Sequence, residues 1–313
     1  MAGAAVRMAV LTDAPRCVVC GSGDTTRWRT PTDVAIWRCR RCGARVTSPA
    51  PSLAHLRERY EEEHRSGKWK RLMEHADGAE IERRARVITG LAPRADGGTL
   101  LDVGFGDGRF LEAAGRLGWK TMGTEIALSA ASRAARGHRR IVGDLDALRE
   151  GPIFDAITFF DVLEHLREPA NMVHQARARL REGGLIVITM PNVRGTASLL
   201  AASHWPYYDF GTFGHIHHLS PRHIRELVRR AGFEAVYEET RGSVDMRDLP
   251  AMYGWPAPSR IGAWVCDKAS GALARIAEPL GFGNTLFTVA RKVPSGFGRA
   301  MGGPEKSRDG ARG

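Results

Sequence analysis

From residue 99 onward, short apolar runs alternate with longer segments in which apolar residues recur every three or four positions. The short runs are typical of buried parallel strands, and the longer segments are typical of helices that bury one face. The pattern predicts strands at Thr99–Val103, Lys120–Glu125, Arg140–Val142, Ala156–Phe160, Leu185–Met190, Phe233–Glu239 and Thr285–Arg291. It predicts helices at Arg109–Leu117, Leu128–Arg136, Asn171–Leu180 and Pro221–Ala231. Such alternation indicates an α/β fold, with a parallel sheet covered by helices on both faces.

The segments around this α/β region differ from it in composition. A charged stretch with spaced apolar residues predicts helix from Ser52 to Leu91, and a second helix is expected near Ile261–Ala277. The C-terminal residues are Gly-rich and charged, which predicts disorder. The expected divisions are a small module at 1–50, a helical linker or cap at 51–95, the main domain at 96–293 with an insertion at 241–283, and a disordered tail at 294–313.

Four of the five cysteines form two Cys-x-x-Cys pairs, and a glycine follows each pair. In a chain without a secretory signal, close pairs indicate a metal site rather than disulfides. Each pair is expected to form a tight turn that aims two thiolates at one ion, and two turns complete the tetrahedron that Zn²⁺ prefers. Four ligands close the site, so the zinc would be structural. The predicted ligands are Cys17, Cys20, Cys39 and Cys42, while the isolated Cys266 is expected to be a small buried hydrophobe.

The composition narrows the class of protein only partly. A hydrophobic share of 43% and a charged share of 26% are those of an ordinary globular protein. No apolar run is long enough to cross a bilayer, and the first residues lack an apolar signal core, so a cytoplasmic protein is expected. The net charge of +11 fits a nucleic-acid or phosphorylated partner, and it fits a well-solvated exterior equally well. No feature of the sequence determines an oligomeric state.

The first predicted strand runs into a glycine-rich turn that opens a helix, in the segment Leu100–Leu111. Glycines let the backbone turn sharply and approach a ligand, and the helix beyond offers unpaired N–H groups. The spacing is GxGxG after Asp102, which is neither the GxGxxG of dinucleotide folds nor a phosphate loop. Glu125 ends the second strand, where a carboxylate can accept hydrogen bonds from ribose hydroxyls, and Asp144 follows the third strand, where it could bind an adenine amino group.

Taken in order over residues 99–192, these motifs resemble those of the class I S-adenosylmethionine-dependent methyltransferases. The resemblance implies a Rossmann-like seven-stranded sheet whose last strand, here Thr285–Arg291, is antiparallel. The Glu-His pair at 164–165 and the Pro-Asn turn at 191–192 are similar to those of small-molecule methyltransferases of ubiquinone and sugar pathways. The resemblance implies that S-adenosylmethionine is bound by Asp102, Gly104, Gly106, Gly108, Glu125, Ile126, Asp144, Leu145, Phe160 and Asp161.

The sulfonium of this donor is a good leaving group, so catalysis needs mainly in-line approach of the acceptor and a place for its proton. The resemblance places Asp161 and His165 near the methionine end of the donor. It also matches His215, in an aromatic and His-rich segment before the helix at Pro221, to a histidine of the family. Gly214 and Leu219 depart from the family's Glu and Phe around it. The predicted catalytic residues are His215, His165 and Asp161.

Plainer interpretations of the same residues stay open. A histidine such as His165 is more often a structural hydrogen-bonding residue than a base. The aromatic residues at 205–213 could be plain core, although their clustering beside the cleft favours an acceptor pocket. The three histidines at 215, 217 and 218 could form a metal site. Tyr60, on the helix after the cysteine module, could reach over the donor, or that helix could merely pack on the sheet.

Three functions compete on these observations. The first is methylation of oxygen or carbon in a small-molecule acceptor such as a sugar, a quinone-like compound or a secondary metabolite. The second is an RNA methyltransferase that holds its substrate with the arginine-rich zinc ribbon, because basic charge neutralises phosphates. No Asn-Pro-Pro-Tyr motif follows the fourth strand, which disfavours that alternative. The third is a zinc-ribbon adaptor that binds the donor without catalysing a reaction.

Overall fold

The computed structural model describes residues 14–28, 35–50, 53–66, 78–93, 98–127, 139–143, 145, 153–208 and 214–294. Three predictions lie outside this part of the chain: the helix at 128–136, the position of Asp144 and the disorder of the tail beyond residue 294.

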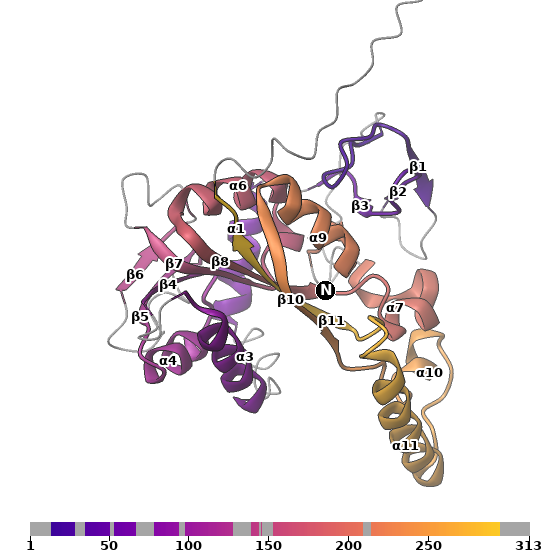
Figure 1. Cartoon of the computed structure of the whole chain (residues 1–313). Helices are drawn as coiled ribbons and strands as arrows, with labels where there is room; N and C mark the ends of the chain where they lie inside the picture. Colours follow the sequence, from indigo (N-terminus) through magenta and orange to yellow (C-terminus); the bar gives the residue numbers. More distant parts are fainter. Residues whose placement is uncertain are drawn as a thin grey trace, which may run out of the picture.

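A seven-stranded sheet forms the centre of the main domain, in the order β10-β11-β8-β7-β4-β5-β6 (Figure 1). Strand β11 is antiparallel to both of its neighbours, and the other neighbouring strands pair in parallel. The sheet and its antiparallel strand are therefore as predicted. The strands are β4 (Thr99–Val103), β5 (Lys120–Glu125), β6 (Arg139–Val142), β7 (Phe154–Phe160), β8 (Leu180–Pro191), β10 (Phe233–Arg241) and β11 (Thr285–Lys292).

Helices cover both faces of this sheet, and neighbouring residues of one strand serve opposite faces, as strand geometry requires. Leu100 and Leu185 pack with α3 (Gly78–Leu91) and α4 (Arg109–Arg116) on one face. Their neighbours Leu101 and Ile186 pack with α6 (Pro169–Arg179) and α9 (Pro221–Arg230) on the other face. Both faces are thus buried, which explains the near-continuous apolar runs of the central strands.

The predicted helical segment before the sheet contains two described helices, α1 (Leu53–Arg65) and α3. The two helices pack in different places. Helix α3 packs on the sheet, whereas Leu56 and Tyr60 of α1 pack with Ile216 beyond the ends of the parallel strands. Helix α1 is thereby placed beside the site described below.

The cysteine module forms a second, antiparallel sheet in the order β1-β2-β3-β9, made of β1 (Thr25–Trp28), β2 (Ile36–Cys39), β3 (Arg45–Thr47) and β9 (His217–His218). The first three strands belong to the module, which is called the ribbon below. The fourth strand, β9, comes from the main domain, about 170 residues later in the chain. The boundary expected at residue 50 therefore separates two segments that share one sheet.

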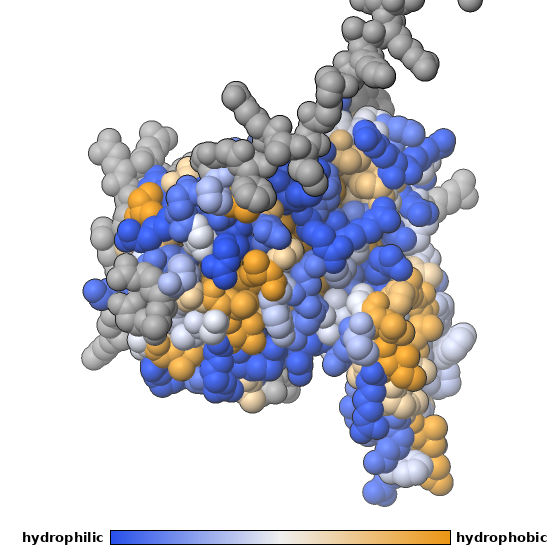
Figure 2. All heavy atoms as spheres, in the orientation of Figure 1, coloured by the Kyte–Doolittle hydropathy of each residue, from blue (hydrophilic) through white to orange (hydrophobic). Residues whose placement is uncertain are grey.

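The insertion contains α10 (Leu249–Met252) and α11 (Arg260–Ala277), and α11 extends away from the rest of the molecule (Figure 1). Ile261 and Trp264 are exposed on it, at 78% and 62% of their surface. Figure 2 shows hydrophobic residues at the surface of this projecting part of the molecule. Cys266 is half-buried on this helix, not buried as predicted, because only one side of α11 contacts the body. In the described part of the chain, no helix is both long and apolar enough to cross a bilayer.

Short helices complete the connection between β8 and β9. They are α7 (Thr196–Ala201) and the 3-10 turns Ala202–His204 and Pro206–Tyr208. A further 3-10 turn, Leu163–His165, follows β7.

Candidate functional site

The glycine turn after β4 adopts a backbone that residues with a β-carbon rarely take. Gly104, Gly106 and Gly108 have φ angles of 75°, 56° and 82°. A Cβ at Gly104 would lie 2.7 Å from Cγ2 of Val162, so this position lacks both the conformation and the space for a side chain. The turn leads into α4 at Gly108. These glycines are therefore required by the shape of the turn.

Glu125 is held at the end of β5 by backbone N–H groups. Its Oε2 accepts a hydrogen bond from Gly106 N at 3.1 Å, and its Oε1 accepts one from Ala127 N at 3.0 Å. Burial raises the pKa of this carboxyl group, although the two N–H donors partly offset the effect. The side chain is thus fixed in one orientation beside the glycine turn.

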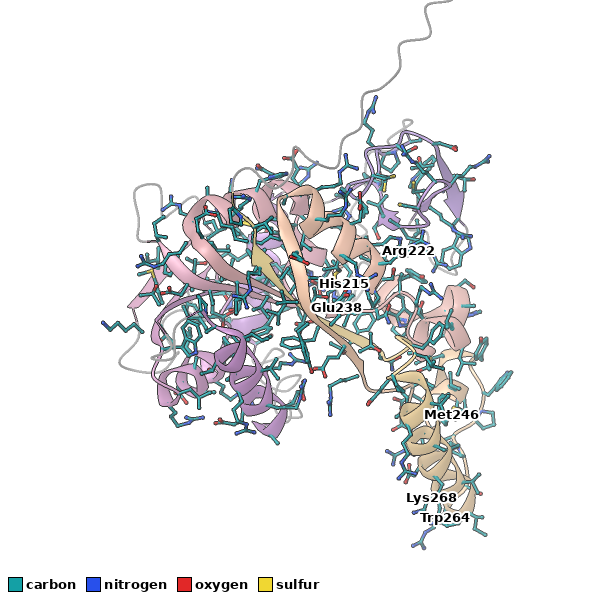
Figure 3. The ribbon with its side chains drawn as sticks, in the orientation of Figure 1. His215, Arg222, Glu238, Met246, Trp264 and Lys268 are labelled. Atoms are coloured by element: carbon teal, nitrogen blue, oxygen red, sulfur yellow. The ribbon has the colours of Figure 1, made fainter. Side chains whose placement is uncertain are left out.

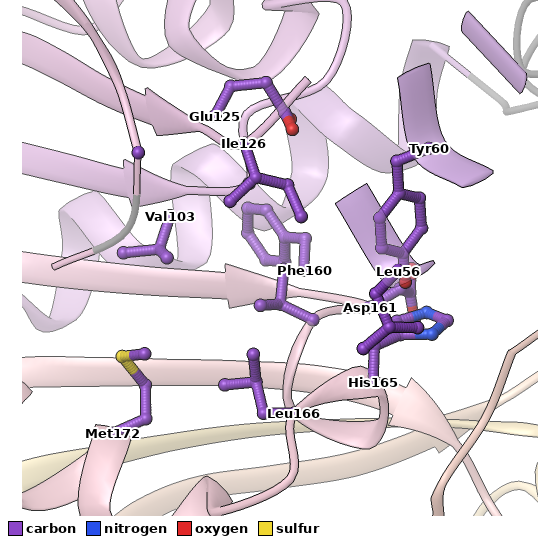
Figure 4. Close-up of a pocket in the computed structure, with 13 residues that line it drawn as sticks. Leu56, Tyr60, Val103, Glu125, Ile126, Phe160, Asp161, His165, Leu166 and Met172 are labelled. Atoms are coloured by element: carbon purple, nitrogen blue, oxygen red, sulfur yellow. The ribbon is translucent and has the colours of Figure 1, made fainter. Parts of the chain in front are cut away.

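A pocket opens at the carboxyl ends of β4, β5 and β7, where α/β folds bind their ligands. Figure 4 shows Tyr60 and His165 at one side of this pocket and Met172 at the other. Residues far apart in the sequence meet here, because α1 covers the strand ends. The lining residues are Leu56, Tyr60, Val103, Gly104, Glu125, Ile126, Gly143, Phe160, Asp161, Val162, His165, Leu166 and Met172.

Six residues predicted from the sequence line this pocket together: Gly104, Glu125, Ile126, Phe160, Asp161 and His165. Five other predicted residues are described but do not line it: Asp102, Gly106, Gly108, Leu145 and His215. The lining residues that sequence reasoning did not assign to a ligand site are mostly apolar. Val103 and Val162 carry a sequence signal, since they directly flank motif residues. Tyr60 lines the pocket as well, at the position where the sequence allowed it to reach over the donor.

Asp102 lies beneath the glycine turn, inside the sheet. It is 2% exposed, and its Oδ1 accepts a hydrogen bond from Thr158 Oγ1 on the neighbouring strand at 2.6 Å. Burial raises the pKa of this carboxyl group to about 7, and the Thr158 hydrogen bond opposes that rise. This contact links β4 to β7 within the sheet.

Asp161 stands at the mouth of the pocket in a strained conformation. Its φ angle is 56°, in the left-handed region, and its backbone N–H donates to Thr189 O at 3.1 Å. Strain of this kind is retained mainly where a site needs a side chain in one direction. The strand-to-turn geometry after β7 thus places Asp161 in the lining of the pocket, where burial raises the pKa of its carboxyl group.

His165 is the histidine that reaches the pocket. Its Nδ1 lies 3.2 Å from the carbonyl oxygen of Gly214, so Nδ1 carries the proton and donates it to that carbonyl. Burial lowers the pKa of the imidazole to about 4. The ring is therefore neutral near pH 7, and its Nε2 is left as a proton acceptor.

His215 lies directly behind His165. The two rings meet edge to face at 4.6 Å between centroids, and Tyr207 stacks on His215 at 4.8 Å with an interplanar angle of 12°. Burial lowers the pKa of His215 well below its ordinary value. His215 therefore belongs to the same cluster as His165 without lining the pocket.

Glu164 lies beside His165 and His215. It was not predicted as a site residue. It is fully buried, and neither carboxylate oxygen has a hydrogen-bond partner in the part of the chain that the structure describes. Burial, together with the charge of Asp161, raises its pKa well above the ordinary value. Donor atoms of Glu164, His165 and His215 lie within 4.8 Å of one another, so this cluster could hold a metal ion.

The two other histidines of this segment take different positions. His217 and His218 are consecutive residues of β9, so their side chains point to opposite faces of the strand. His218 Nε2 lies 3.0 Å from Thr47 Oγ1 of the ribbon. Among the residues described, the possible metal cluster with Glu164 and His165 includes His215, but it does not include His217 or His218.

The four paired cysteines of the ribbon converge on one point. Cys17 Sγ and Cys42 Sγ are 3.5 Å apart, Cys20 Sγ and Cys39 Sγ are 3.6 Å apart, and all four sulfurs lie within 4.8 Å of one another. A disulfide needs about 2 Å between its sulfurs, whereas four thiolates at about 2.3 Å from one Zn²⁺ lie just under 4 Å apart. The arrangement therefore fits a closed, structural zinc site.

Comparison with known proteins supports the assignment that the fold suggests. A family model described as a methyltransferase domain matches residues 69–238, which is more than half of the chain. The ubiquinone biosynthesis O-methyltransferase of Cupriavidus pinatubonensis is 27% identical over 168 residues, a stretch that covers 50% of this chain and 66% of that protein. The chain thus spans just under two thirds of the length of this curated relative.

Two solved structures share the fold at low sequence identity. One is a chain from the complex of the Haloferax volcanii Trm112 methyltransferase activator, with a TM-score of 0.53, 18% identity, and coverage of 75% of this chain and 98% of that chain. The other is the Burkholderia thailandensis 1,6-didemethyltoxoflavin-N1-methyltransferase, solved with S-adenosylhomocysteine, with a TM-score of 0.50, 15% identity, and coverage of 86% and 99%. The sheet order, the glycine turn and the match over 69–238 lead to one conclusion: the chain belongs to the methyltransferase-domain family.

Proposed function

We propose that this protein transfers a methyl group from S-adenosylmethionine to oxygen or carbon of a small-molecule acceptor. The observation that carries the proposal is the pocket itself, where the glycine turn, a fixed Glu125 and His165 face one another at the ends of the strands. An acceptor of the quinone-like, sugar or secondary-metabolite kind is favoured, since the matched relative is a ubiquinone biosynthesis enzyme. We further propose that the protein acts in the cytoplasm, where the four ribbon thiols stay reduced and hold zinc.

The donor residues have separate tasks in this proposal. Glu125 would accept hydrogen bonds from the two ribose hydroxyls, because its backbone donors leave lone pairs directed at the pocket. Gly104 would let the backbone approach the ligand, and Asp161 would place a negative charge near the sulfonium. When bound, S-adenosylmethionine supplies an electrophilic methyl group on a positively charged sulfur. Ile126 and Phe160, which line the pocket, complete the proposed donor contacts together with Asp144. The other residues proposed for donor binding do not line the pocket and would act through the shape of the turn and strand ends: Asp102, Gly106, Gly108 and Leu145.

The proposed proton acceptor is Nε2 of His165. The ring is neutral near pH 7, its tautomer is set by the Gly214 carbonyl, and it lines the pocket directly. His215 is also a catalytic residue predicted from the sequence, yet it lies one ring farther from the pocket. We therefore assign His215 the task of supporting His165. When His165 gains a proton, its positive charge stabilises the ionised form of the neighbouring Glu164 carboxyl group. Protonation of His165 therefore favours loss of the proton from Glu164.

The test begins with donor binding. Isothermal calorimetry with S-adenosylhomocysteine should show binding to the wild-type protein and about tenfold weaker binding to Glu125→Gln, which loses charge-assisted hydrogen bonds. The matched control is Glu234→Gln, the same substitution at an exposed position of β10. Absence of binding to the wild-type protein would end the proposal.

The acceptor class is tested next with methyl-labelled S-adenosylmethionine and pools of small molecules or RNA. Label should enter the small-molecule fraction. Label in RNase-sensitive material would instead establish the RNA alternative. Binding of the donor without transfer to either pool would support the non-catalytic adaptor.

A further inference from the structure

The segment that carries His215 is paired with the ribbon. In β9, His217 pairs with Val46 and His218 pairs with Arg45 of β3. Just before this strand, Thr47 N donates to Ile216 O at 2.7 Å, and the Thr47 hydroxyl lies 3.0 Å from His218 Nε2. In the sheet order, β3 is the neighbour of β9, which lies at the sheet edge. The pairing of residues 216–218 within that sheet therefore depends on the ribbon.

The cysteine turns are attached to the main domain at a second place, helix α9. The carbonyl oxygen of Cys42 lies 2.9 Å from His223 Nε2 and also accepts a hydrogen bond from Arg222. In the other turn, Val19 O accepts a hydrogen bond from Arg230 at 3.1 Å. Figure 3 labels Arg222, on the side of α9 that the ribbon contacts. Both turns thus contact α9 through carbonyls whose direction depends on the cysteine site.

Aromatic rings connect the ribbon with the pocket. Trp28 of the ribbon meets Tyr208 at 5.0 Å between centroids, and Tyr208 meets His218 at 4.8 Å. Trp205 touches both Tyr208, at 5.0 Å, and Tyr207, at 5.1 Å. From Tyr207 the contacts continue through the stacked His215 to the pocket histidine, His165.

Together these contacts form a shared core. Ile36 of β2 is fully buried in one apolar cluster with Trp205 and Tyr208, and Trp28 packs against that cluster. A packed interior transmits a displacement of one side chain to its neighbours. The donor side of the pocket, by contrast, is built from the turn after β4 and the end of β5, and Gly104 and Glu125 are positioned within the main domain.

We propose that the ribbon is a positioning element of the reaction site, which sets the place of His215 and thereby of His165, and leaves the donor side untouched. The inference rests on the proposed function for the meaning of these histidines. Thr47 is the central positioning residue, since it makes both a backbone and a side-chain hydrogen bond to the segment. Zinc, which the four cysteines fit, would keep the ribbon rigid enough for this task.

Hydrogen–deuterium exchange of the full-length protein tests this coupling without an acceptor. Thr47→Val removes the hydroxyl and leaves a buried imidazole nitrogen without its partner, so a peptide covering 214–219 should exchange about tenfold faster. Thr47→Ser keeps the hydroxyl and should restore the wild-type rate. The matched control is Thr26→Val in β1, which pairs with β2 at the far edge of the same sheet.

Removal of zinc with a mercurial reagent provides the second arm. Zinc removal should also speed exchange in the peptide covering 214–219. The exchange rates of peptides covering β4 and β5, and the affinity for S-adenosylhomocysteine, should stay at wild-type values. Unchanged exchange over 214–219 in both Thr47→Val and the zinc-depleted protein would overturn the proposal, and so would an equal rise over β4 and β5. Wild-type protein that fails to bind S-adenosylhomocysteine would refute the proposed function instead, because the exchange experiment reads the coupling independently.

Once an acceptor is identified, kinetics adds a readout that a merely structural role would not change. Thr47→Val should lower kcat through the displaced histidines, with the affinity for the donor unchanged. Equal loss of donor affinity and turnover would indicate general destabilisation and contradict the proposal.

Discussion

Replacing Gly104 by alanine tests the central claim about the donor turn. Its φ angle of 75° costs a residue with a β-carbon about 1–2 kcal/mol. The new Cβ would also lie 2.7 Å from Cγ2 of Val162, and over-packing of this kind costs about 1–3 kcal/mol. The free energy of unfolding should therefore fall by about 2–5 kcal/mol. For a domain of this size, each kcal/mol lowers Tm by roughly 2–4 °C, so a decrease of roughly 4–20 °C is expected.

The assay is a thermal unfolding scan followed by calorimetry with S-adenosylhomocysteine. Because Gly104 lines the pocket, binding should weaken by about tenfold or more even where the variant is folded. The matched control is Gly90→Ala in α3, where no heavy atom lies within 4 Å of the new Cβ. Alanine in a helix should stabilise this control by about 0.5–1 kcal/mol. A Gly104→Ala variant that melts with the wild type and binds the ligand equally well would refute the reasoning about the turn.

Three further predictions concern the histidines and the cysteines. His165→Gln should lower the rate of methyl transfer by about 10²–10⁴-fold while the affinity for the donor is retained. The matched control, His174→Gln on the exposed side of α6, should keep the wild-type rate. Equal rates for the two variants would show that His165 does not take part in the reaction. Burial lowers the pKa of His217 to about 4 from 6.5, so protonation of this side chain favours the unfolded state. Between pH 7.5 and 4.5 the free energy of unfolding of the wild type should therefore fall by about 2–3 kcal/mol relative to that of His217→Gln. A difference between the two proteins that stays constant with pH in denaturant melts would contradict this. Atomic emission spectroscopy should find one zinc ion per chain in the wild type and in Cys266→Ser, and none in Cys39→Ser; zinc retained by Cys39→Ser would exclude the four-cysteine site.

Local patterns in the sequence were sufficient for the frame of the fold. The strands β4 and β5 begin and end where the apolar runs predict. Strand β11 is antiparallel to its neighbours, as the family resemblance implied, but its place between β10 and β8 was not predicted. Side-chain periodicity is a property of consecutive residues, so it can be read without knowledge of the partner segments. The glycine turn followed the same logic, because a left-handed backbone strongly favours glycine wherever such a turn occurs.

The composition of the pocket was predictable only in part. Glu125 and Asp161 end strands of one parallel sheet, and such ends meet at a common edge. The apolar side of the pocket was missed, because Leu56 and Met172 belong to amphipathic helices on which any apolar residue serves equally well as core. Glu164 belongs to the Glu-His motif, yet nothing in its neighbours along the chain indicates that it is buried with neither carboxylate oxygen hydrogen-bonded to a described residue.

By itself, the sequence determined which segments form strands and helices, where the donor turn lies, and which four cysteines face one another, because each depends on spacing over a few residues. Only the tertiary structure decided that His165 and His215 meet, and that Thr47 of the ribbon pairs with the segment before His218. His165 and His215 are 50 positions apart in the sequence, and Thr47 and His218 are 171 positions apart. Such contacts depend on how whole helices and strands pack together, so local spacing does not predict them. The ribbon therefore looks separate in the sequence and shares a sheet with the main domain in the folded protein.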